Sequence, residues 1–178
     1  MILLFLLGLA AGSFLNVVAL RYKPGGWLFT KDILLGRSHC PKCQKVLRWY
    51  ELIPLVSFVV QFGHCRHCHH LISWQYPIVE LLSGLIFVTV PPIWILTSLT
   101  LILIALIDYR LSIIPDQLNL FLAFLGLAFL GINSVLGAIF GGGLFGAIIF
   151  LTKGRGMGFG DLKLAVALGF LFGWPKIL

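Results

Sequence analysis

Charged residues are scarce in this chain of 178 residues: 11% are Asp, Glu, Lys or Arg, whereas 60% are hydrophobic. A soluble domain has roughly 25% charged residues. Residues 1–20, 81–107 and 117–152 contain none at all, and a helix that crosses a bilayer needs about 20 largely apolar residues. The composition therefore excludes a soluble domain. It predicts an all-α, polytopic membrane protein in which residues 117–152 form two helices with a break near residues 131–134.

A basic segment is missing before the first apolar stretch, and a removable signal peptide would need one. Residues 1–20 are therefore expected to form a retained transmembrane helix. Its small residues Gly8, Gly12 and Ser13 suit a close approach to another helix. Asn16 is expected to bond a neighbouring helix, with a place in a site as the alternative.

Acidic residues are scarcer than basic ones, six against thirteen, and eight of the basic residues lie in residues 21–74. Under the positive-inside rule this segment, together with residues 108–116 and 153–160, is expected in the cytoplasm. The uncharged turn at Pro91 and Pro92 is then external. Because topology accounts for the basic charge, no binding to nucleic acid is expected.

Cysteine is confined to one polar segment, where it forms two C-x-x-C pairs with 21 residues between them. This spacing is close to that of four-cysteine zinc ribbons. A disulfide is disfavoured in a reducing cytosol, and a thioredoxin-like redox site would need only one pair. The segment therefore predicts a structural zinc, with one of the nearby histidines as an alternative ligand. The four expected ligands are Cys40, Cys43, Cys65 and Cys68.

Two features near the membrane boundary leave alternatives open. The apolar run at residues 52–60 is too short to span a bilayer, so it is expected either to lie on the membrane or to pack against the helices. Glu80, at the start of the next apolar stretch, is expected to pair with a loop cation, with a role in a site as the alternative.

Two aspartates, Asp108 and Asp161, lie where apolar runs meet charged residues. Carboxylates in such places are costly to desolvate, and this makes them functional candidates. Two helices lie between them, and an even number returns the chain to the same membrane face. Asp161 and Asp116 also suit helix N-caps, whereas Asp108 ends a helix, where the dipole disfavours negative charge. Two carboxylates that meet can share one proton and activate a water molecule.

Several motifs occur in the order seen in bacterial type IV prepilin leader peptidase/N-methyltransferases, a family that the chain resembles over nearly its whole length. They are Gly12-Ser13-Phe14-Leu15-Asn16-Val17-Val18, the two cysteine pairs, Tyr76-Pro77-Ile78-Val79-Glu80, Asp108 with Ile114-Pro115-Asp116, and Gly158-Phe159-Gly160-Asp161-Leu162-Lys163.

The resemblance implies a membrane-embedded aspartic endopeptidase of the bacterial inner membrane. Such enzymes remove the basic leader of prepilins and pseudopilins at the cytoplasmic face, after a glycine, in support of pilus assembly or type II secretion. Many then methylate the new N-terminal residue with S-adenosylmethionine. The cysteine segment marks this bifunctional branch, so the methyltransferase expectation depends on it.

By motif position, the resemblance assigns the catalytic pair to Asp108 and Asp161 and leaves Asp116 as a carboxylate outside the pair. Gly158, Gly160 and Lys163 are supporting residues. A helix start favours negative charge, and Lys163 follows two residues later. Asp161 is therefore expected to be mainly the base and Asp108 mainly the acid.

Three segments are expected. Residues 1–20 form the first transmembrane helix, residues 21–74 the zinc-binding segment linked to methylation, and residues 75–178 the peptidase domain, with about six transmembrane helices in all. Family members usually continue beyond the helix that holds Asp161. This chain stops within it at Leu178, so we expect a fragment whose peptidase domain is incomplete.

Two alternatives remain. A presenilin-like protease would also use a G-x-G-D aspartate but lacks a tetracysteine loop after its first helix. A zinc-bearing scaffold or a proton-coupled transporter would need no peptidase chemistry. Transporters, however, commonly carry polar groups near the bilayer midplane and internal repeats, whereas both aspartates here lie at the membrane edge and the apolar segments show no evident repeat.

Overall fold

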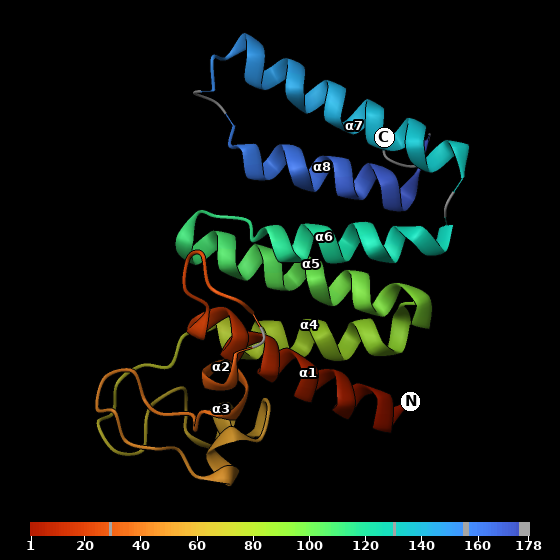
Figure 1. Ribbon diagram of the computed structural model, residues 1–178. Helices are drawn as coiled ribbons and strands as arrows, with labels where there is room; N and C mark the ends of the chain where they lie inside the picture. Colours follow the sequence, from red (N-terminus) through yellow and green to blue (C-terminus); the bar gives the residue numbers. More distant parts are fainter. Residues whose placement is uncertain (29, 130, 155–156, 175–178) are drawn as a thin grey trace. The chain divides into compact units, whose positions relative to one another are not determined.

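The computed structural model describes residues 1–28, 30–129, 131–154 and 157–174, and these are helical or irregular, without a strand (Figure 1). The predicted all-α class is therefore confirmed. The chain divides into two compact units, Met1–Leu106 and Ile107–Leu178. Three helices are long and apolar enough to cross a membrane: α1 (Ile2–Arg21), α5 (Pro92–Leu111) and α7 (Ile132–Leu151). A helix of this length covers about 30 Å, the thickness of the hydrocarbon core.

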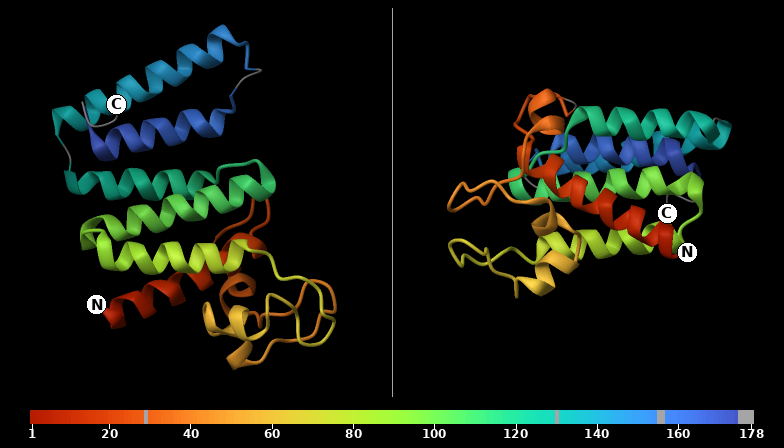
Figure 2. Two further views of the ribbon diagram at one scale, coloured as in Figure 1. Left: turned by 180° about the vertical axis from the view of Figure 1, so that it is seen from behind. Right: turned by 90° about the horizontal axis from the view of Figure 1, so that it is seen from below.

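The first unit is built on the contact between α1 and α4 (Gln75–Thr89), which lie side by side (Figures 1 and 2). A Cβ atom added at Gly12 would lie 2.8 Å from the Glu80 Cα, and one added at Gly8 would lie 2.7 Å from the Gly84 Cα. No side chain fits at either position without moving α4. The predicted role of the small residues of α1 in close helix packing is confirmed.

Asn16 is fully buried in the same contact. Its amide nitrogen donates to the Tyr76 carbonyl oxygen at 3.4 Å, and its side-chain oxygen accepts from the Gln75 side chain at 3.2 Å. The expectation that Asn16 bonds a neighbouring helix is therefore confirmed. These bonds satisfy a polar group that would be costly to bury alone.

The polar connection between α1 and α4 contains three short helical pieces, α2 (Lys31–Leu35), η1 (Trp49–Leu52) and α3 (Val56–Val60). The Arg21 guanidinium, at the end of α1, donates to the carbonyl oxygens of Ile33 at 2.8 Å and Gly36 at 2.7 Å. These bonds fix α2 to the end of α1. The apolar run at residues 52–60 is divided between η1 and α3.

The second unit contains α6 (Asp116–Gly126), η2 (Leu127–Phe129), α7 and α8 (Phe159–Phe172), with α8 packed against both α6 and α7 (Figures 1 and 2). Gly137 of α7 and Gly169 of α8 touch, and a Cβ atom on either would overlap the other's carbonyl oxygen. The predicted breaks are confirmed. α4 ends before Pro91, and α7 starts after its N-cap residue Gly131.

Two expectations about α8 were wrong. Gly158 is the N-cap, so Asp161 is the third residue of the helix and not its cap. The helix also ends at Phe172 and does not continue to Leu178. Gly173 has a left-handed φ of 70°, and the Trp174 N–H then donates to the Asn133 carbonyl oxygen at 2.8 Å. Glycine adopts this conformation without steric cost and so ends the helix. Residues 175–178 lie outside the described residues.

Candidate active site and cysteine cluster

A cavity of about 230 Å³ in the second unit collects the residues expected in the peptidase site. Its lining comes from the end of α5 and the following loop, the start of α6, and the start of α8. The structure thus brings together residues that are separated by about 50 positions in sequence. The lining residues are Asp108, Ser112, Ile113, Ile114, Asp116, Gly158, Gly160, Asp161 and Lys163.

Asp161 is oriented by the first turn of α8. The Gly158 N–H donates to the Asp161 Oδ2 at 3.1 Å, and the Asp161 N–H donates back to the Gly158 carbonyl oxygen at 3.2 Å. A Cβ atom at Gly160 would lie 3.2 Å from the Ile114 Cβ. The glycine therefore allows the start of α8 to lie close to the loop after α5. This loop also lines the cavity.

Asp108 lies in the last turn of α5 and is exposed. The Ser112 N–H donates to the Asp108 carbonyl oxygen at 2.7 Å, and Ser112 itself has a positive φ of 52°. This reversal ends α5, and Pro115 then precedes α6 as its N-cap. The sharp turn is what places Asp108 and Asp116, eight residues apart, on one cavity.

Lys163 lines the same cavity as Asp161, and its ion-pair partner is Asp116. Its Nζ donates to both carboxylate oxygens of Asp116, at 2.7 and 2.9 Å. Residues two apart on a helix point to different sides, so the side chains of Asp161 and Lys163 are not directed at each other. The Asp116–Lys163 pair joins α6 to α8. Asp116 is the first helical residue of α6, and its carboxylate pairs with Lys163, whereas we expected it to be the N-cap.

The four cysteines of the polar segment form one cluster, with all Sγ atoms within 4.8 Å of one another. The Cys40 and Cys68 Sγ atoms are 3.8 Å apart. A tetrahedral zinc with Zn–S bonds of about 2.3 Å places its sulfur ligands about 3.8 Å apart. Four thiols at this spacing fit zinc, with one ion held by Cys40, Cys43, Cys65 and Cys68.

The two cysteine pairs belong to a repeat with an offset of 25 residues. The Cys40 N–H donates to the Lys45 carbonyl oxygen at 3.0 Å, and the Cys65 N–H donates to the His70 carbonyl oxygen at 2.9 Å. Equivalent bridges join His39 to Val46 and His64 to Leu71. This repeat was not predicted from the sequence, although the pattern H-C-x-x-C-x-x followed by two aliphatic residues occurs at both places.

The thiols of the cluster differ in acidity. Burial by itself raises the pKa of Cys40, but hydrogen bonds from backbone N–H groups of its own loop and from neighbouring thiols lower it to about 7. A backbone hydrogen bond at His70 lowers the pKa of Cys68, yet burial and the other three thiols raise it to about 11. Cys40 is therefore readily ionised near neutral pH. A bound cation would favour ionisation of the other thiols as well.

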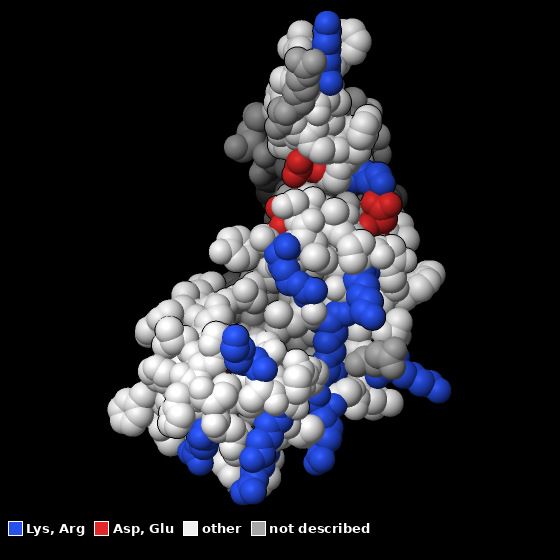
Figure 3. All heavy atoms as spheres, turned by 90° about the vertical axis from the view of Figure 1, so that its left-hand side faces the viewer, with Lys and Arg blue, Asp and Glu red and all other residues white. Residues whose placement is uncertain are grey.

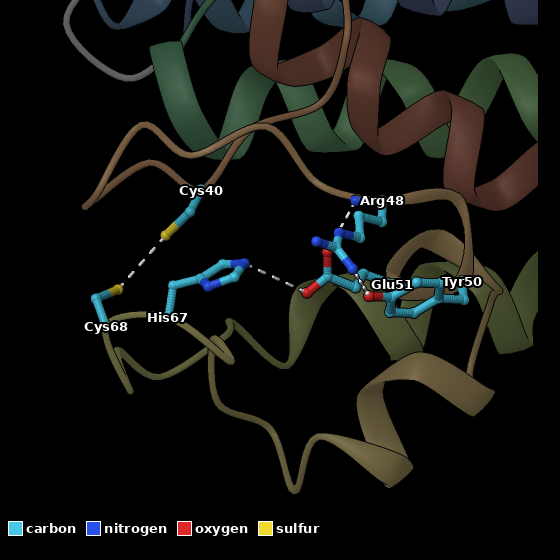
Figure 4. A network of polar contacts seen from close by, with 6 residues as sticks. All are labelled: Cys40, Arg48, Tyr50, Glu51, His67 and Cys68. Atoms are coloured by element: carbon cyan, nitrogen blue, oxygen red, sulfur yellow. Dashed lines mark hydrogen bonds and ion pairs between the residues drawn. The ribbon is translucent and has the colours of Figure 1, made fainter.

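Glu51 ties η1 to the second cysteine loop (Figure 4). It is buried; the Arg48 backbone N–H donates to its Oε2 at 2.8 Å, and the His67 Nε2 lies 4.0 Å from its Oε1. The Arg48 guanidinium donates to the Tyr50 hydroxyl at 3.0 Å. The sequence offered no signal for this role, because Glu51 lies in no recognisable motif.

Glu80 of α4 bonds the residue that precedes α3. Its Oε2 accepts from the Leu55 N–H at 2.8 Å, and the Ser13 hydroxyl also bonds the carboxylate. Among the described residues, these bonds replace the expected ion pair with a loop cation. Leu55 has a positive φ of 58°. The hydrogen bond that its N–H donates to Glu80 therefore stabilises an uncommon backbone conformation.

Comparison with known proteins identifies the family of the chain. Residues 6–94 match the family described as the bacterial peptidase A24 N-terminal domain, and residues 95–178 match the type IV leader peptidase family. The prepilin leader peptidase/N-methyltransferase of Aeromonas salmonicida is 36% identical, over 98% of this chain and 74% of that protein. Proteins of the same name from Myxococcus xanthus and Bacillus subtilis are 36% and 34% identical, over 99% and 96% of this chain and 57% and 73% of their own lengths. No solved structure matches.

The family match and the apolar helices define an integral membrane protein that is an aspartic-type peptidase. The chain belongs to the type IV leader peptidase family, with the N-terminal domain of its bacterial members.

Proposed function

We propose that this chain removes the basic leader of prepilins and pseudopilins, after a glycine, at the cytoplasmic face of the bacterial inner membrane. It then methylates the new N-terminal residue with S-adenosylmethionine, in support of pilus assembly or type II secretion. The names of its relatives support both activities. The observation that carries the peptidase part is the cavity lined by both Asp108 and Asp161.

The peptidase mechanism uses these two carboxylates in different states. The ionised one accepts a proton from water as the water oxygen attacks the scissile carbonyl carbon, while the protonated one donates to the carbonyl oxygen. The C–N bond then breaks, and a proton passes to the leaving amine. Asp161 acts mainly as the base, because the start of α8 and the Gly158 N–H stabilise negative charge. Asp108, at the end of α5, acts mainly as the acid.

A cleavage assay on a prepilin tests the catalytic pair. Asp108→Asn and Asp161→Asn are each expected to lower the cleavage rate by roughly 100- to 10,000-fold, because a general acid or base contributes a factor of this size. Tyr109→Phe is the matched control, since Tyr109 is exposed beside Asp108 and does not line the cavity. Cleavage at the normal rate in both Asn variants, with insertion in the membrane intact, would contradict the peptidase assignment.

Infrared difference spectroscopy tests the separate roles. We expect the band of a protonated carboxyl to disappear in Asp108→Asn and to persist in Asp161→Asn, because Asp108 is the proposed acid of the pair. Tyr109→Phe should leave the band unchanged. Loss of the band in Asp161→Asn alone would show that the two roles are exchanged.

Residues 21–74 are proposed as the zinc-binding domain that supports methylation, and residues 75–178 as the peptidase domain. Zinc held by the four cysteines would supply structure, because four thiolates leave no open coordination position. Cysteine substitutions are therefore expected to affect methylation or stability more than peptide-bond cleavage.

The proposed topology has about six transmembrane helices and places residues 21–74, 108–116 and 153–160 in the cytoplasm. α4 and α8, with 15 and 14 residues, are shorter than the three long helices. Lys and Arg side chains are spread over the face drawn in Figure 3. The positive-inside rule favours a cytoplasmic position for the loop segments that carry these residues.

A further inference from the structure

The short helix α3 exposes apolar side chains instead of burying them. None of its five residues is buried, Val59 is 68% exposed, and Phe62, just after the helix, is 86% exposed. Trp74, at the start of α4, is 70% exposed and contacts Phe58 of α3 with ring centroids 5.0 Å apart. These residues, with Val56 and Val60, form one apolar surface, which we call the α3 patch.

The α3 patch lies beside the first turn of α4. Leu55, the N-cap of α3, donates its N–H to Glu80 of α4 at 2.8 Å, and the ring contact between Phe58 and Trp74 is a second connection. Figures 1 and 2 agree that α3 lies next to the start of α4 and the end of α1. The patch therefore lies at the level where these two helices meet the polar segment.

The residues that lead into α3 are held at two points. Glu51, at the end nearer the first cysteine pair, is bonded to the Arg48 backbone and lies against His67 (Figure 4). Glu80 holds Leu55 at the start of α3. The start of α3 is thus anchored to α4 through Leu55, and the preceding turn is anchored to the second cysteine loop through Glu51.

The patch continues the lipid-facing side of α4. Ile78, Leu81 and Leu82 of α4 are exposed apolar residues, as expected for a helix in contact with lipid. Trp74 extends this surface toward the polar segment, and tryptophan is enriched at the boundary between membrane and water. The polar segment that carries α3, residues 21–74, is basic, with eight Lys and Arg residues against two acidic ones, which suits the anionic cytoplasmic leaflet.

We propose that the α3 patch is an interfacial anchor that inserts among the acyl chains and headgroups of the cytoplasmic leaflet. It thereby fixes the cysteine domain against the bilayer. The inference depends on α4 lying in the membrane but not on the peptidase chemistry. A five-residue helix cannot span a bilayer, whereas apolar side chains on a short helix can enter its interface.

Photo-crosslinking of the full chain tests this anchor. The chain is reconstituted in nanodiscs of phosphatidylethanolamine and phosphatidylglycerol, with p-benzoylphenylalanine at Phe62 or at Val59. Both probes are expected to form lipid adducts, detected by mass spectrometry. A probe at Lys45, exposed in the first cysteine loop, is the matched control, because this loop extends away from α1 and α4 (Figures 1 and 2), and it should give none.

A charged variant keeps the test independent of probe chemistry. Val59→Asp should abolish the lipid adduct of a probe at Phe62, whereas Val59→Leu should preserve it, with zinc content unchanged in both. Absence of lipid adducts at Phe62 and Val59 would overturn the proposal. So would adducts there with a second copy of the chain or with an added prepilin, since these outcomes assign the patch to another occupant. Prepilin cleavage by the wild-type chain is measured separately, so failure of the anchor is distinguishable from failure of the proposed function.

Discussion

At the scale of single residues, the thiols of the cysteine cluster determine how it meets a metal. The pKa of Cys40 is lowered to about 7, and the pKa of Cys68 is raised to about 11. Thiolates bind zinc, so protons on these sulfurs must leave when the ion enters. Above pH 7 Cys40 is already mostly ionised, and below it Cys40 must release a proton. Cys68 releases its proton at any pH below 11.

The affinity for zinc should therefore fall more steeply below about pH 7 than above it. The logarithm of the apparent affinity is expected to change by about one additional unit per pH unit once Cys40 must release its own proton. Competition with a chelator, corrected for the protonation of the chelator, measures this slope on the purified chain. Cys68→Ser is the control for a lost ligand and should lower affinity at every pH. A slope that stays constant from pH 6 to 8 would contradict the assignment of the low pKa to Cys40.

Some residue roles followed from the sequence and others did not. The clustering of the four cysteines and the interhelical bonds of Asn16 followed from the sequence, because thiol spacing predicts the first and the cost of burying an amide predicts the second. The bonding partners of Lys163 and Glu80 did not follow from the sequence. Lys163 reaches a residue 47 positions away, and Glu80 bonds a backbone N–H 25 positions away. Neither partner is visible before the fold is known.

At the scale of helices, the Asp116–Lys163 pair joins the starts of α6 and α8 at the cavity. Both side chains are more than half exposed, and an exposed pair contributes only about 0–1 kcal/mol to stability. The pair matters for the position of α8, which carries Asp161, relative to α6, whose start lines the same cavity. We infer that the pair positions α8 and takes no direct part in the chemistry.

Reversing the charges tests this positioning role. Asp116→Lys and Lys163→Asp, made singly, place like charges together and should lower prepilin cleavage by roughly 10- to 100-fold, because small misplacements of catalytic groups have effects of this size. The double variant should recover most of the activity, with KM and the melting temperature near those of the wild type. Double and single variants that are equally impaired would mean that Asp116 or Lys163 acts directly on the substrate.

Helix boundaries were more predictable than contacts. Pro91 and Pro92, Gly131 and the turn before Asp116 interrupt helices in the places expected from their backbone preferences. The end of α8 was missed because apolar residues, among them Trp174, Ile177 and Leu178, still follow it in the sequence. Hydrophobicity favours continuation there, but Gly173 adopts a left-handed conformation and stops the helix.

At the scale of the whole molecule, composition establishes a membrane protein, but the lengths of its helices leave the number of crossings open. The three helices of 20 residues match the bilayer. In contrast, α4, α6 and α8, with 15, 11 and 14 residues, cover only about 17–23 Å at 1.5 Å per residue, less than the roughly 30 Å hydrocarbon core. Six crossings therefore require local thinning of the bilayer or polar groups that lie below its surface. For α8 the second case applies naturally, since its first turn carries Asp161 on a cavity with exposed charged groups.

Labelling of cysteines in intact cells with an impermeant maleimide tests the six-helix topology. A cysteine at Pro91 should react from outside, because the turn between α4 and α5 is uncharged and exposed. A cysteine at Lys153 should react only after the membrane is made permeable, because basic loops are retained in the cytoplasm. The native cysteines provide the control, since the unmodified chain should not be labelled from outside. External labelling at Lys153 would put Asp108 and Asp161 on opposite sides of the membrane, and the proposed catalytic pair could not form.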